Sequence, residues 1–351
     1  MKVVHLVPAL EQGGVESVVC DLVRELGKGE EGTGNRWESV VVSKGGRLVE
    51  RIAAAGGRHI ALDLKSKNPL TYFSRAWKLR KILCAEKPDL VCAHSRVPAW
   101  LFAWANRGLG LRWITYAHGA NSISRYSAVM TKGDLVVTPS RFLADYLKAN
   151  YGTPEAKIRV IPNSVDFRRF DPDNLDQAFI AEKRRAWGIR EGDHVIMAIG
   201  RITPVKGLDN LIREFAAAKS DNVKLIIVGG ADRHHLKYLE SLKKLAKDLR
   251  RETRDVIFAG GQEKIPECIS IADEVVSANT VKPETFGLSV IEAYAMNKPV
   301  RAKHFGGVGE VMEAVENAKA SSLREAVRML YSSELQAART LALYREVVGR
   351  E

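Results

Sequence analysis

Short apolar runs alternate along the chain with longer stretches in which apolar residues recur at helical spacing. The first series of runs occupies residues 3–7, 40–42, 90–93, 113–117, 135–137 and 158–161. A second series occupies residues 194–199, 225–228, 256–259 and 274–277. Continuous apolar strands separated by helix-length segments are typical of parallel sheets covered by helices on both faces. The pattern therefore predicts an α/β protein with two doubly wound parallel-sheet domains.

A segment rich in Pro, Asn and Asp, from Pro162 to Asn174, separates the two series. This composition favours a hinge or crossover, and a chain of 351 residues has the length of two domains. We place the domains at residues 1–165 and 166–351, with the C-terminal helix crossing back to the first domain. In parallel sheets ligands bind beyond the carboxyl ends of the strands. We therefore expect functional residues just after the predicted strands, at a cleft between the domains.

The overall composition narrows the class of protein. Apolar residues make up 46% and charged residues 27%, and no apolar run reaches the roughly 18 residues of a membrane span. The first residues, Met1 to Pro8, have the character of a strand rather than a signal peptide. The four cysteines are scattered, without the spacing of a metal cage. We expect a cytoplasmic protein with reduced thiols.

The formal net charge of +12 predicts an anionic partner. The basic stretch at 237–254 also contains acidic residues and lacks a cluster of aromatic residues, so nucleic acid is not expected. Residues 64–85 contain six cations and no acidic residue, interleaved with Leu70, Phe73 and Trp77. This basic amphipathic segment is either a solvated helix face over the core or a peripheral contact with an anionic membrane. Its charge leads us to expect the membrane contact.

A glycine pair, Gly13 and Gly14, follows the first predicted strand and precedes a helical pattern. Glycines at such a turn let backbone amides approach an anion, and the helix N-terminus adds partial positive charge. The spacing departs from that of a dinucleotide-binding loop. A glycine turn without a ligand is an equal alternative.

A stronger candidate follows the predicted strand at 194–199. Arg201 and Lys206 flank a proline turn there, and a helical pattern begins directly after it. An arginine can bind two phosphate oxygens while a lysine supplies a compact charge. The pair suits a diphosphate held without a metal ion; the alternative is two solvated surface cations.

Two glutamates bracket a glycine turn after the last predicted strand, Glu284 in the loop and Glu292 on the helix. A loop carboxylate beside the backbone amides of Phe286, Gly287 and Leu288 suits the binding of sugar hydroxyls and phosphate. The helical carboxylate is placed to reach a ribose. The alternative for Glu292 is simple stabilisation of the helix dipole.

Together these segments resemble glycosyltransferase family 4. The resemblance covers residues 3 to about 312 and rests on Gly13-Gly14, Pro162 to Asp166, Arg201 with Lys206-Gly207, Glu284 to Glu292, Pro299-Val300, Gly306-Gly307 and Glu310. It implies a GT-B fold of two Rossmann-like domains and a retaining, metal-independent glycosyltransferase. The co-substrate implied is a nucleotide diphosphate sugar based on UDP, GDP or ADP, with no other cofactor.

The family pattern also implies roles for single residues. Arg201 and Lys206 hold the diphosphate, Glu284 holds the transferred sugar and Glu292 the ribose. His118 matches a position near the reacting carbon, although a core or loop histidine is an alternative. The catalytic residues expected are these two cations with Glu284 and His118.

Further donor contacts implied by the resemblance are backbone ones. They come from Phe286, Gly287 and Leu288 in the second domain and from Gly13 and Gly14 in the first. No residue is identified as a nucleophile.

Residues 121–134 are similar to lipopolysaccharide-assembly members of the family. This likeness implies a membrane-associated glycolipid or polysaccharide acceptor, and an enzyme peripheral at the inner face of the membrane. Asp171 and Asp173 match the D-x-D of metal-dependent glycosyltransferases, but they lie in the predicted crossover, so no metal is expected there. The alternatives are a GT-B nucleotide-sugar epimerase and a non-catalytic sugar-nucleotide binding protein.

Overall fold

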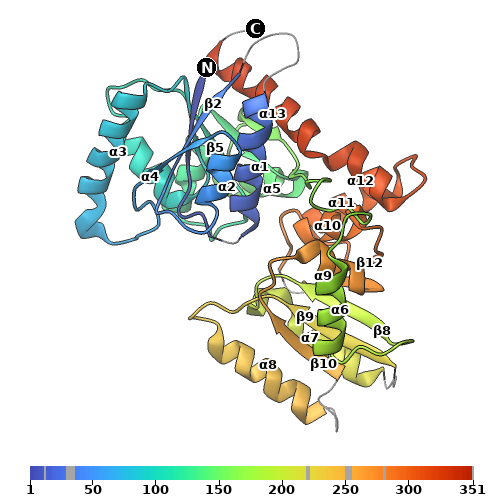
Figure 1. Cartoon of the computed structure of the whole chain (residues 1–351). Helices are drawn as coiled ribbons and strands as arrows, with labels where there is room; N and C mark the ends of the chain where they lie inside the picture. The colour runs from blue at the N-terminus through green and yellow to red at the C-terminus, as the bar shows by residue number, and fades with distance from the viewer. Residues whose placement is uncertain (12, 29–35, 219–221, 250–254, 280–281, 350–351) are drawn as a thin grey trace. The chain divides into compact units, whose positions relative to one another are not determined.

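The computed structural model describes residues 1–351 except for 12, 29–35, 219–221, 250–254, 280–281 and 350–351. The chain divides into two compact units, one of residues 1–164 with 333–351 and one of residues 165–332. Each unit contains its own parallel sheet with helices packed against it (Figure 1). The predicted α/β class with two doubly wound parallel sheets is confirmed.

The first unit is built on a seven-stranded sheet with the order β3-β2-β1-β4-β5-β6-β7. Its strands are β1 (Lys2–Leu6), β2 (Glu38–Ser43), β3 (Arg58–Ala61), β4 (Leu90–Ala93), β5 (Trp113–Tyr116), β6 (Leu135–Thr138) and β7 (Ile158–Val160). The chain order reverses between β1 and β4, which pair directly, with His5 beside Cys92. A crevice at the carboxyl ends of two such strands is the usual ligand position in this class of sheet.

The helices of the first unit cover both faces of this sheet. They are α1 (Gly14–Lys28), α2 (Val49–Ala54), α3 (Tyr72–Glu86), α4 (Arg96–Ala105), α5 (Arg141–Tyr151) and α13 (Ser333–Val348), with short 3-10 turns η1 (Pro69–Thr71), η2 (Ser127–Thr131) and η3 (Glu155–Lys157). Within the described residues, no helix combines the length and the apolar character of a membrane span.

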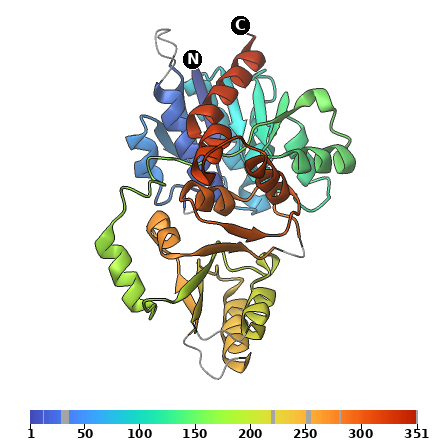
Figure 2. The ribbon, with the colours of Figure 1, turned by 90° about the vertical axis from the view of Figure 1, so that its right-hand side faces the viewer.

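Helix α13 comes from the far end of the chain and packs beside α1 (Figure 1 and Figure 2). Its Tyr344 is fully buried, with the hydroxyl 3.2 Å from the thiol of Cys92 and 3.2 Å from the hydroxyl of Tyr116. The ring of Tyr344 meets Trp37 edge-on. A bulky aromatic side chain with a partnered hydroxyl ties this helix to the sheet.

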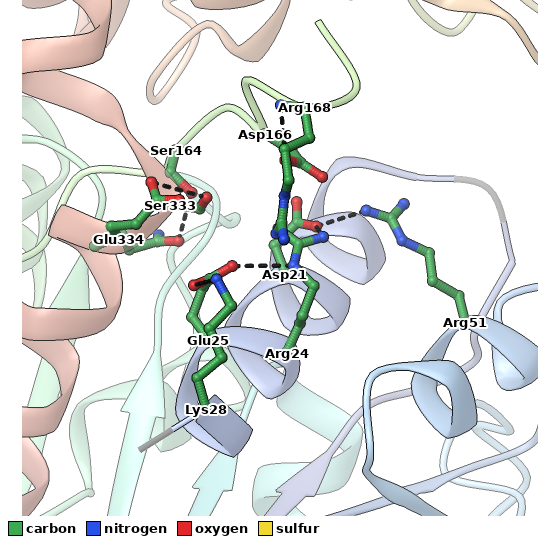
Figure 3. Close-up of polar contacts among 11 residues, drawn as sticks. Asp21, Arg24, Glu25, Lys28, Arg51, Ser164, Asp166, Arg168, Ser333 and Glu334 are labelled. Atoms are coloured by element: carbon green, nitrogen blue, oxygen red, sulfur yellow. Dashed lines mark hydrogen bonds and ion pairs between the residues drawn. The ribbon is translucent and has the colours of Figure 1, made fainter. Parts of the chain in front are cut away.

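Helix α1 also carries two buried carboxylates, Asp21 and Glu25, that are held by cations (Figure 3). Asp21 accepts hydrogen bonds from Arg51 at 2.6 Å and from Arg24 at 3.1 Å, and Glu25 accepts from Arg24 and Lys28. Burial alone would raise the pKa of Glu25, but the hydrogen bonds from Lys28 and Arg24 lower it below its usual value. Glu25 therefore stays ionised, and the ion pair of Asp21 with Arg51 fastens α1 to α2, since buried charges are tolerated only when they are paired.

The second unit contains a five-stranded sheet with the order β10-β9-β8-β11-β12. Its strands are β8 (His194–Ile199), β9 (Val223–Val228), β10 (Val256–Gly260), β11 (Glu274–Ser277) and β12 (Val300–Ala302). Its helices are α6 (Gln177–Ala186), α7 (Leu208–Ala217), α8 (Leu236–Leu249), α9 (Ile265–Ile271), α10 (Leu288–Ala295), α11 (Gly307–Glu316) and α12 (Leu323–Tyr331), with the 3-10 turn η4 (Pro204–Lys206). Here the chain order reverses between β8 and β11.

All ten apolar runs singled out in the sequence are strands, but β3 and β12 were missed. Both lie at the edge of a sheet, and each carries an arginine among only a few residues. An edge strand is half solvated and needs no continuous apolar run. The apolar pattern on which the prediction rests is therefore absent from both.

Candidate active site

A pocket in the second unit lies at the carboxyl ends of β8 and β11, where the strand order reverses. Gly200, Arg201 and Lys206 line it on the β8 side, and Ser277 and Asn279 line it on the β11 side. Side chains that follow neighbouring parallel strands meet at the same edge of a sheet, which is where ligands of such sheets bind. The pair of cations predicted from the sequence is thus brought together in one pocket.

Lys206 ends the 3-10 turn η4, and its side chain passes over Gly200. Gly200 has a φ of +143°, and a Cβ at this position would lie 3.5 Å from Cε of Lys206. The Nζ of Lys206 donates to Oε1 of Glu284 at 2.6 Å. Both side chains are about a quarter exposed, at 23% and 22%. Lys206 is therefore partly shielded from water, while Arg201 in the same pocket is exposed.

Glu284 is held in place by the backbone of Gly306 and Gly307. The amide of Gly307 donates to the carbonyl of Glu284 at 2.8 Å, and a Cβ on Gly307 would lie only 2.2 Å from the carbonyl oxygen of Thr285. No side chain fits at that distance, so the close approach of these two segments requires glycine. Gly306 and Gly307, which are part of the family resemblance, therefore position the Glu284 loop.

Two buried acceptor oxygens at this site have no hydrogen-bond partner among the described residues. They are Oε2 of Glu284 and Oδ1 of Asn279. Leaving a buried polar atom unpaired costs about 1–3 kcal/mol, so each such atom requires an explanation. A ligand that carries hydroxyl or N–H groups would satisfy both.

Asn279 was missed by the sequence reasoning. It comes two residues after β11 ends at Ser277, which is the position at which functional residues were expected. A polar side chain directly after an apolar strand was the available signal.

The other predicted donor residues follow Glu284 along the chain. The side chain of Phe286 is buried and meets Tyr331 edge-on, so only its backbone remains for a ligand. Gly287 has a φ of +97° and precedes Leu288, the first residue of α10. Glu292 is half-buried in the second turn of α10 and is not among the described residues that line the pocket.

The aspartates of the D-x-D match lie in the crossover of the second unit. Asp171 accepts a hydrogen bond from Arg324 at 3.3 Å. Its carboxylate is therefore engaged by a guanidinium. No group of three or more metal-ligating side chains occurs in the part of the chain that the structure describes.

The predicted site residues of the first unit lie after two of its strands. Gly13 precedes α1 and Gly14 begins it, following the loop after β1. His118 lies two residues after β5 and lines a small cavity together with His94, Tyr116 and Asn163. The rings of Tyr116 and His94 stack with their centroids 4.6 Å apart. The ring of His118 also stacks on that of Tyr116, with the centroids 6.0 Å apart, so His118 packs against other side chains of the first unit.

Three histidines form a hydrogen-bonded chain at this position. Nδ1 of His5 lies 3.1 Å from Nε2 of His94, and Nδ1 of His94 lies 3.1 Å from Nε2 of His118. Burial lowers the pKa of His5 and of His118 to about 4. Burial, with the two neighbouring rings acting in the same direction, also holds the pKa of His94 well below its usual value. All three rings are therefore neutral at physiological pH.

Comparisons with known proteins cover both units. Residues 12–169 match the family model described as Glycosyltransferase Family 4, and residues 179–339 match the one described as Glycosyl transferases group 1. The lipopolysaccharide 1,2-N-acetylglucosaminetransferase of Salmonella typhimurium is 26% identical over 253 residues, which are 69% of this chain and 62% of that protein. The chain spans about half the length of the curated relatives it matches.

Solved structures resemble the whole chain. A glycosyltransferase from Rickettsia africae is 24% identical with a TM-score of 0.80, covering 100% of this chain and 99% of that one. HepE of Anabaena in complex with UDP and glucose is 20% identical with a TM-score of 0.75, covering 99% of this chain and 95% of that one. At this identity the likeness shows the fold, which is that of GT-B glycosyltransferases.

Proposed function

The chain belongs to glycosyltransferase family 4, and on this premise we propose that it moves a sugar, with retention of configuration, from a nucleotide diphosphate sugar to a membrane-associated glycolipid or polysaccharide. The observation that carries the proposal is the pocket between β8 and β11. Arg201, Lys206 and Asn279 line it, and Lys206 in turn holds Glu284. Oδ1 of Asn279 and Oε2 of Glu284 have no partner among the described residues. Such a pocket suits a ligand that is both anionic and rich in hydroxyl groups.

Glycosyl transfer passes through a transition state in which the sugar ring becomes positively charged and the departing diphosphate gains negative charge. Arg201 and Lys206 are placed to stabilise the diphosphate, because fixed cations aimed at developing charge contribute most in a site shielded from water. Lys206 is the more shielded of the two. These two residues supply the charge that a bound metal would otherwise provide.

Glu284 serves in this proposal as the ligand of the transferred sugar. Its Oε1 is held by Lys206, which leaves Oε2 to accept a hydrogen bond from a sugar hydroxyl. Asn279 supplies a second acceptor, and its amide adds hydrogen-bond donors. Glu292 is assigned to the ribose, and the backbone amides of residues 286–288 to phosphate or sugar, by the family pattern.

For the first unit we assign His118 to the reacting carbon and the glycine pair before α1 to the donor phosphates. Both assignments rest on the family pattern. A ring that is neutral at physiological pH acts through hydrogen bonds rather than through charge.

Helix α3 and the turn before it support a membrane-associated acceptor. Leu70, Phe73 and Trp77 are exposed at 90%, 62% and 50%, and the ammonium of Lys81 lies 3.7 Å from the ring centre of Trp77. Exposed apolar side chains on a segment that also carries several lysines suit the interface of an anionic bilayer. The named activity of the Salmonella relative, on lipopolysaccharide, supports an acceptor of the same kind at the inner face of the membrane.

One cation of this segment is not available for such a contact. Arg75 is buried, and its guanidinium donates to the backbone carbonyls of Thr71, Asp63 and Asn68. It therefore fastens the loop before α3 to the helix. The surface charge of the segment comes from its lysines and from Arg80, which is itself anchored to the carbonyls of Ala105 and Arg107.

Product analysis tests the proposed function. The protein is incubated with UDP-, GDP- and ADP-sugars and with glycolipid extracts, after thermal shift has identified the nucleotide that raises its melting temperature. A new glycosidic bond with retained configuration and an equal yield of nucleoside diphosphate is expected. An epimerised nucleotide sugar would support the epimerase alternative, and binding without any product would support a non-catalytic module.

A further inference from the structure

The loop of residues 119–126, which follows β5, is fixed by side chains of α4 and α5. Three aromatic side chains donate hydrogen bonds to its backbone carbonyls: Tyr146 to Asn121, Tyr151 to Ser122 and Trp100 to Tyr126. A loop that is already ordered loses little conformational freedom when a ligand binds to it. The backbone that carries the exposed side chains of this loop is therefore preorganised for binding.

The loop exposes an arginine and a tyrosine beside a second arginine. Among the described residues, Arg125 has no hydrogen-bond partner for its exposed side chain, and neither has the hydroxyl of Tyr126, which is 38% exposed. The ring of Tyr126 lies nearly parallel to that of Trp100, with centroids 6.5 Å apart. Arg96, the first residue of α4, lies 5.4 Å from the centre of the Tyr126 ring and donates to the hydroxyl of Ser127 at 3.2 Å. Arg96, Trp100, Arg125 and Tyr126 make up this arginine–tyrosine surface.

The sequence around the arginine–tyrosine surface carries charge of one sign. Residues 90–133 contain no Asp or Glu, and neither do residues 64–85, which include most of α3. Cations that are not offset by acidic neighbours attract anionic ligands. An arginine can bind two oxygens of a phosphate or a carboxylate at once. The charge therefore indicates an anionic occupant.

The arginine–tyrosine surface lies at the edge of the sheet where ligands bind. Arg96 follows β4 and the loop follows β5, so both stand at the carboxyl ends of neighbouring parallel strands. Helix α3 packs beside α4 (Figure 1), and the hydroxyl of Tyr72 donates to the carbonyl of Trp100 at 2.8 Å. The surface is therefore next to the exposed apolar side chains of α3. The sugars of a glycolipid could reach it while the lipid stays at α3.

We propose that Arg96, Arg125 and Tyr126 bind an anionic saccharide, a sugar chain with phosphate or carboxylate groups, and that this saccharide is part of the acceptor. The second half of this statement rests on the proposed function. The two guanidinium groups bind the anionic oxygens, and the Tyr126 hydroxyl, which can donate and accept, binds a sugar hydroxyl. The loop also exposes Ile123 at 63%, which would suit a bilayer. The fixed ring of Tyr126 at the strand ends favours a saccharide instead.

Titrations followed by nuclear magnetic resonance, without any sugar nucleotide, test the arginine–tyrosine surface directly. The probes are glucose 6-phosphate, glucose and inorganic phosphate. The reporter is the indole N–H signal of Trp100, which Trp100→Phe assigns and which depends on the hydrogen bond to Tyr126. We expect glucose 6-phosphate to shift this signal and to bind about tenfold or more tightly than either other probe, because it engages the arginines and the hydroxyl together. A signal that glucose 6-phosphate leaves unmoved, or that inorganic phosphate moves equally well, would overturn the proposal.

Paired substitutions separate this surface from the overall charge of the protein. Arg96→Gln combined with Arg125→Gln should raise the Kd for glucose 6-phosphate about tenfold or more. Arg112→Gln combined with Lys132→Gln removes the same charge from exposed residues that precede β5 and β6, and should leave the Kd unchanged. Lys206→Ala should also leave it unchanged, because that lysine belongs to the pocket of the second unit. Equal Kd values in the two paired variants would contradict the assignment.

Transfer kinetics and vesicle binding keep this proposal separate from the proposed function. If glucose 6-phosphate moves the Trp100 signal but the protein forms no product from any sugar nucleotide, the saccharide site is supported and the proposed function fails. If the protein transfers sugar and Arg96→Gln with Arg125→Gln leaves the KM for the acceptor unchanged, the function stands and the site is overturned. If that paired variant loses binding to phosphatidylglycerol vesicles but keeps its affinity for glucose 6-phosphate, a bilayer is the occupant and the proposal is wrong.

Discussion

The ammonium of Lys206 lies 2.6 Å from a carboxylate oxygen of Glu284, although 78 residues separate the two in the chain. The family pattern assigns the two residues to different parts of the donor, Lys206 to the diphosphate and Glu284 to the transferred sugar. Each charge is therefore already partly neutralised by the other before a ligand binds. A donor that enters would bring its phosphate to the cation and its hydroxyls to the free oxygen of the carboxylate.

Removing the cation of this pair should reduce transfer while the protein stays folded. We expect Lys206→Ala to lower kcat/KM about tenfold to a hundredfold, because a hydrogen bond to a charged group contributes roughly 1.5–3 kcal/mol. The loss of its ion pair with Glu284 should lower the free energy of unfolding by less than this amount, since the pair is partly exposed. Steady-state kinetics and circular dichroism measure both effects. Lys243→Ala, which removes an exposed lysine 2.8 Å from Glu240, is the control, and unchanged kinetics in Lys206→Ala would remove the assignment.

Truncation of Asn279 should weaken donor binding without loss of stability. Its Oδ1 is buried without a described partner, so Asn279→Ala gives up no intramolecular hydrogen bond at that atom. We expect the Kd for the donor to rise about tenfold, the effect of roughly one lost hydrogen bond of 1–2 kcal/mol. Isothermal titration with the nucleotide sugar and a thermal melt measure the two quantities. Asn317→Ala, at an exposed helix end, should change neither.

Adding one methyl group at Gly307 should disturb the Glu284 loop. The new Cβ would lie 2.2 Å from the carbonyl oxygen of Thr285, and backbone cannot yield as a flexible side chain does. We expect Gly307→Ala to lower the free energy of unfolding by about 1–3 kcal/mol and to reduce kcat as well. Gly261→Ala adds a methyl group in open space and should leave stability unchanged. Equal stability of the two variants would show that the close approach does not matter.

The histidine chain should make the protein sensitive to acid. The pKa of His5 is about 4 when folded, because of burial, and returns to about 6.5 when the chain unfolds. As the pH falls through this window the unfolded state binds a proton that the folded state does not, so stability is lost. From neutral pH to about pH 4.5 the loss from His5 should be roughly 2–3 kcal/mol.

Urea unfolding at the two pH values measures this loss in the wild type and in His5→Leu. The variant should show a correspondingly smaller pH dependence, because it lacks the group that is protonated on unfolding. The same pH dependence in both proteins would contradict the assignment of the effect to His5.

Membrane binding should depend on the exposed apolar side chains of α3. We expect Phe73→Ser combined with Trp77→Ser to reduce sedimentation with phosphatidylglycerol vesicles by tenfold or more, since burying a large apolar side chain is worth about 1.5–3 kcal/mol. Added salt should weaken the binding of the wild type, because its lysines contribute through screened charges. Met329→Ser, which replaces an equally exposed side chain on α12, is the control. Equal sedimentation of all three proteins would exclude this surface.

Local pattern was sufficient for the fold class and for the loops that carry Arg201, Lys206 and Glu284. Apolar periodicity reports which segments are strands, and in parallel sheets the residues after strands are the ones that meet ligands. Edge strands β3 and β12 were not predicted because their solvated sides carry no such apolar pattern. The burial of Arg75 was not predicted either, since it depends on backbone carbonyls of the loop that precedes its helix.

What the sequence determined by itself was therefore the kind of architecture and the chemical types available at each strand end. Only the tertiary structure decided which of those groups are partners. The sheet order places β1 beside β4 and β4 beside β5, so His5, His94 and His118 become neighbours. The same reversal of order in the second sheet sets Asn279 opposite Gly200 in one pocket. Periodicity is a property of neighbours along the chain, whereas these contacts depend on the order in which distant strands pair.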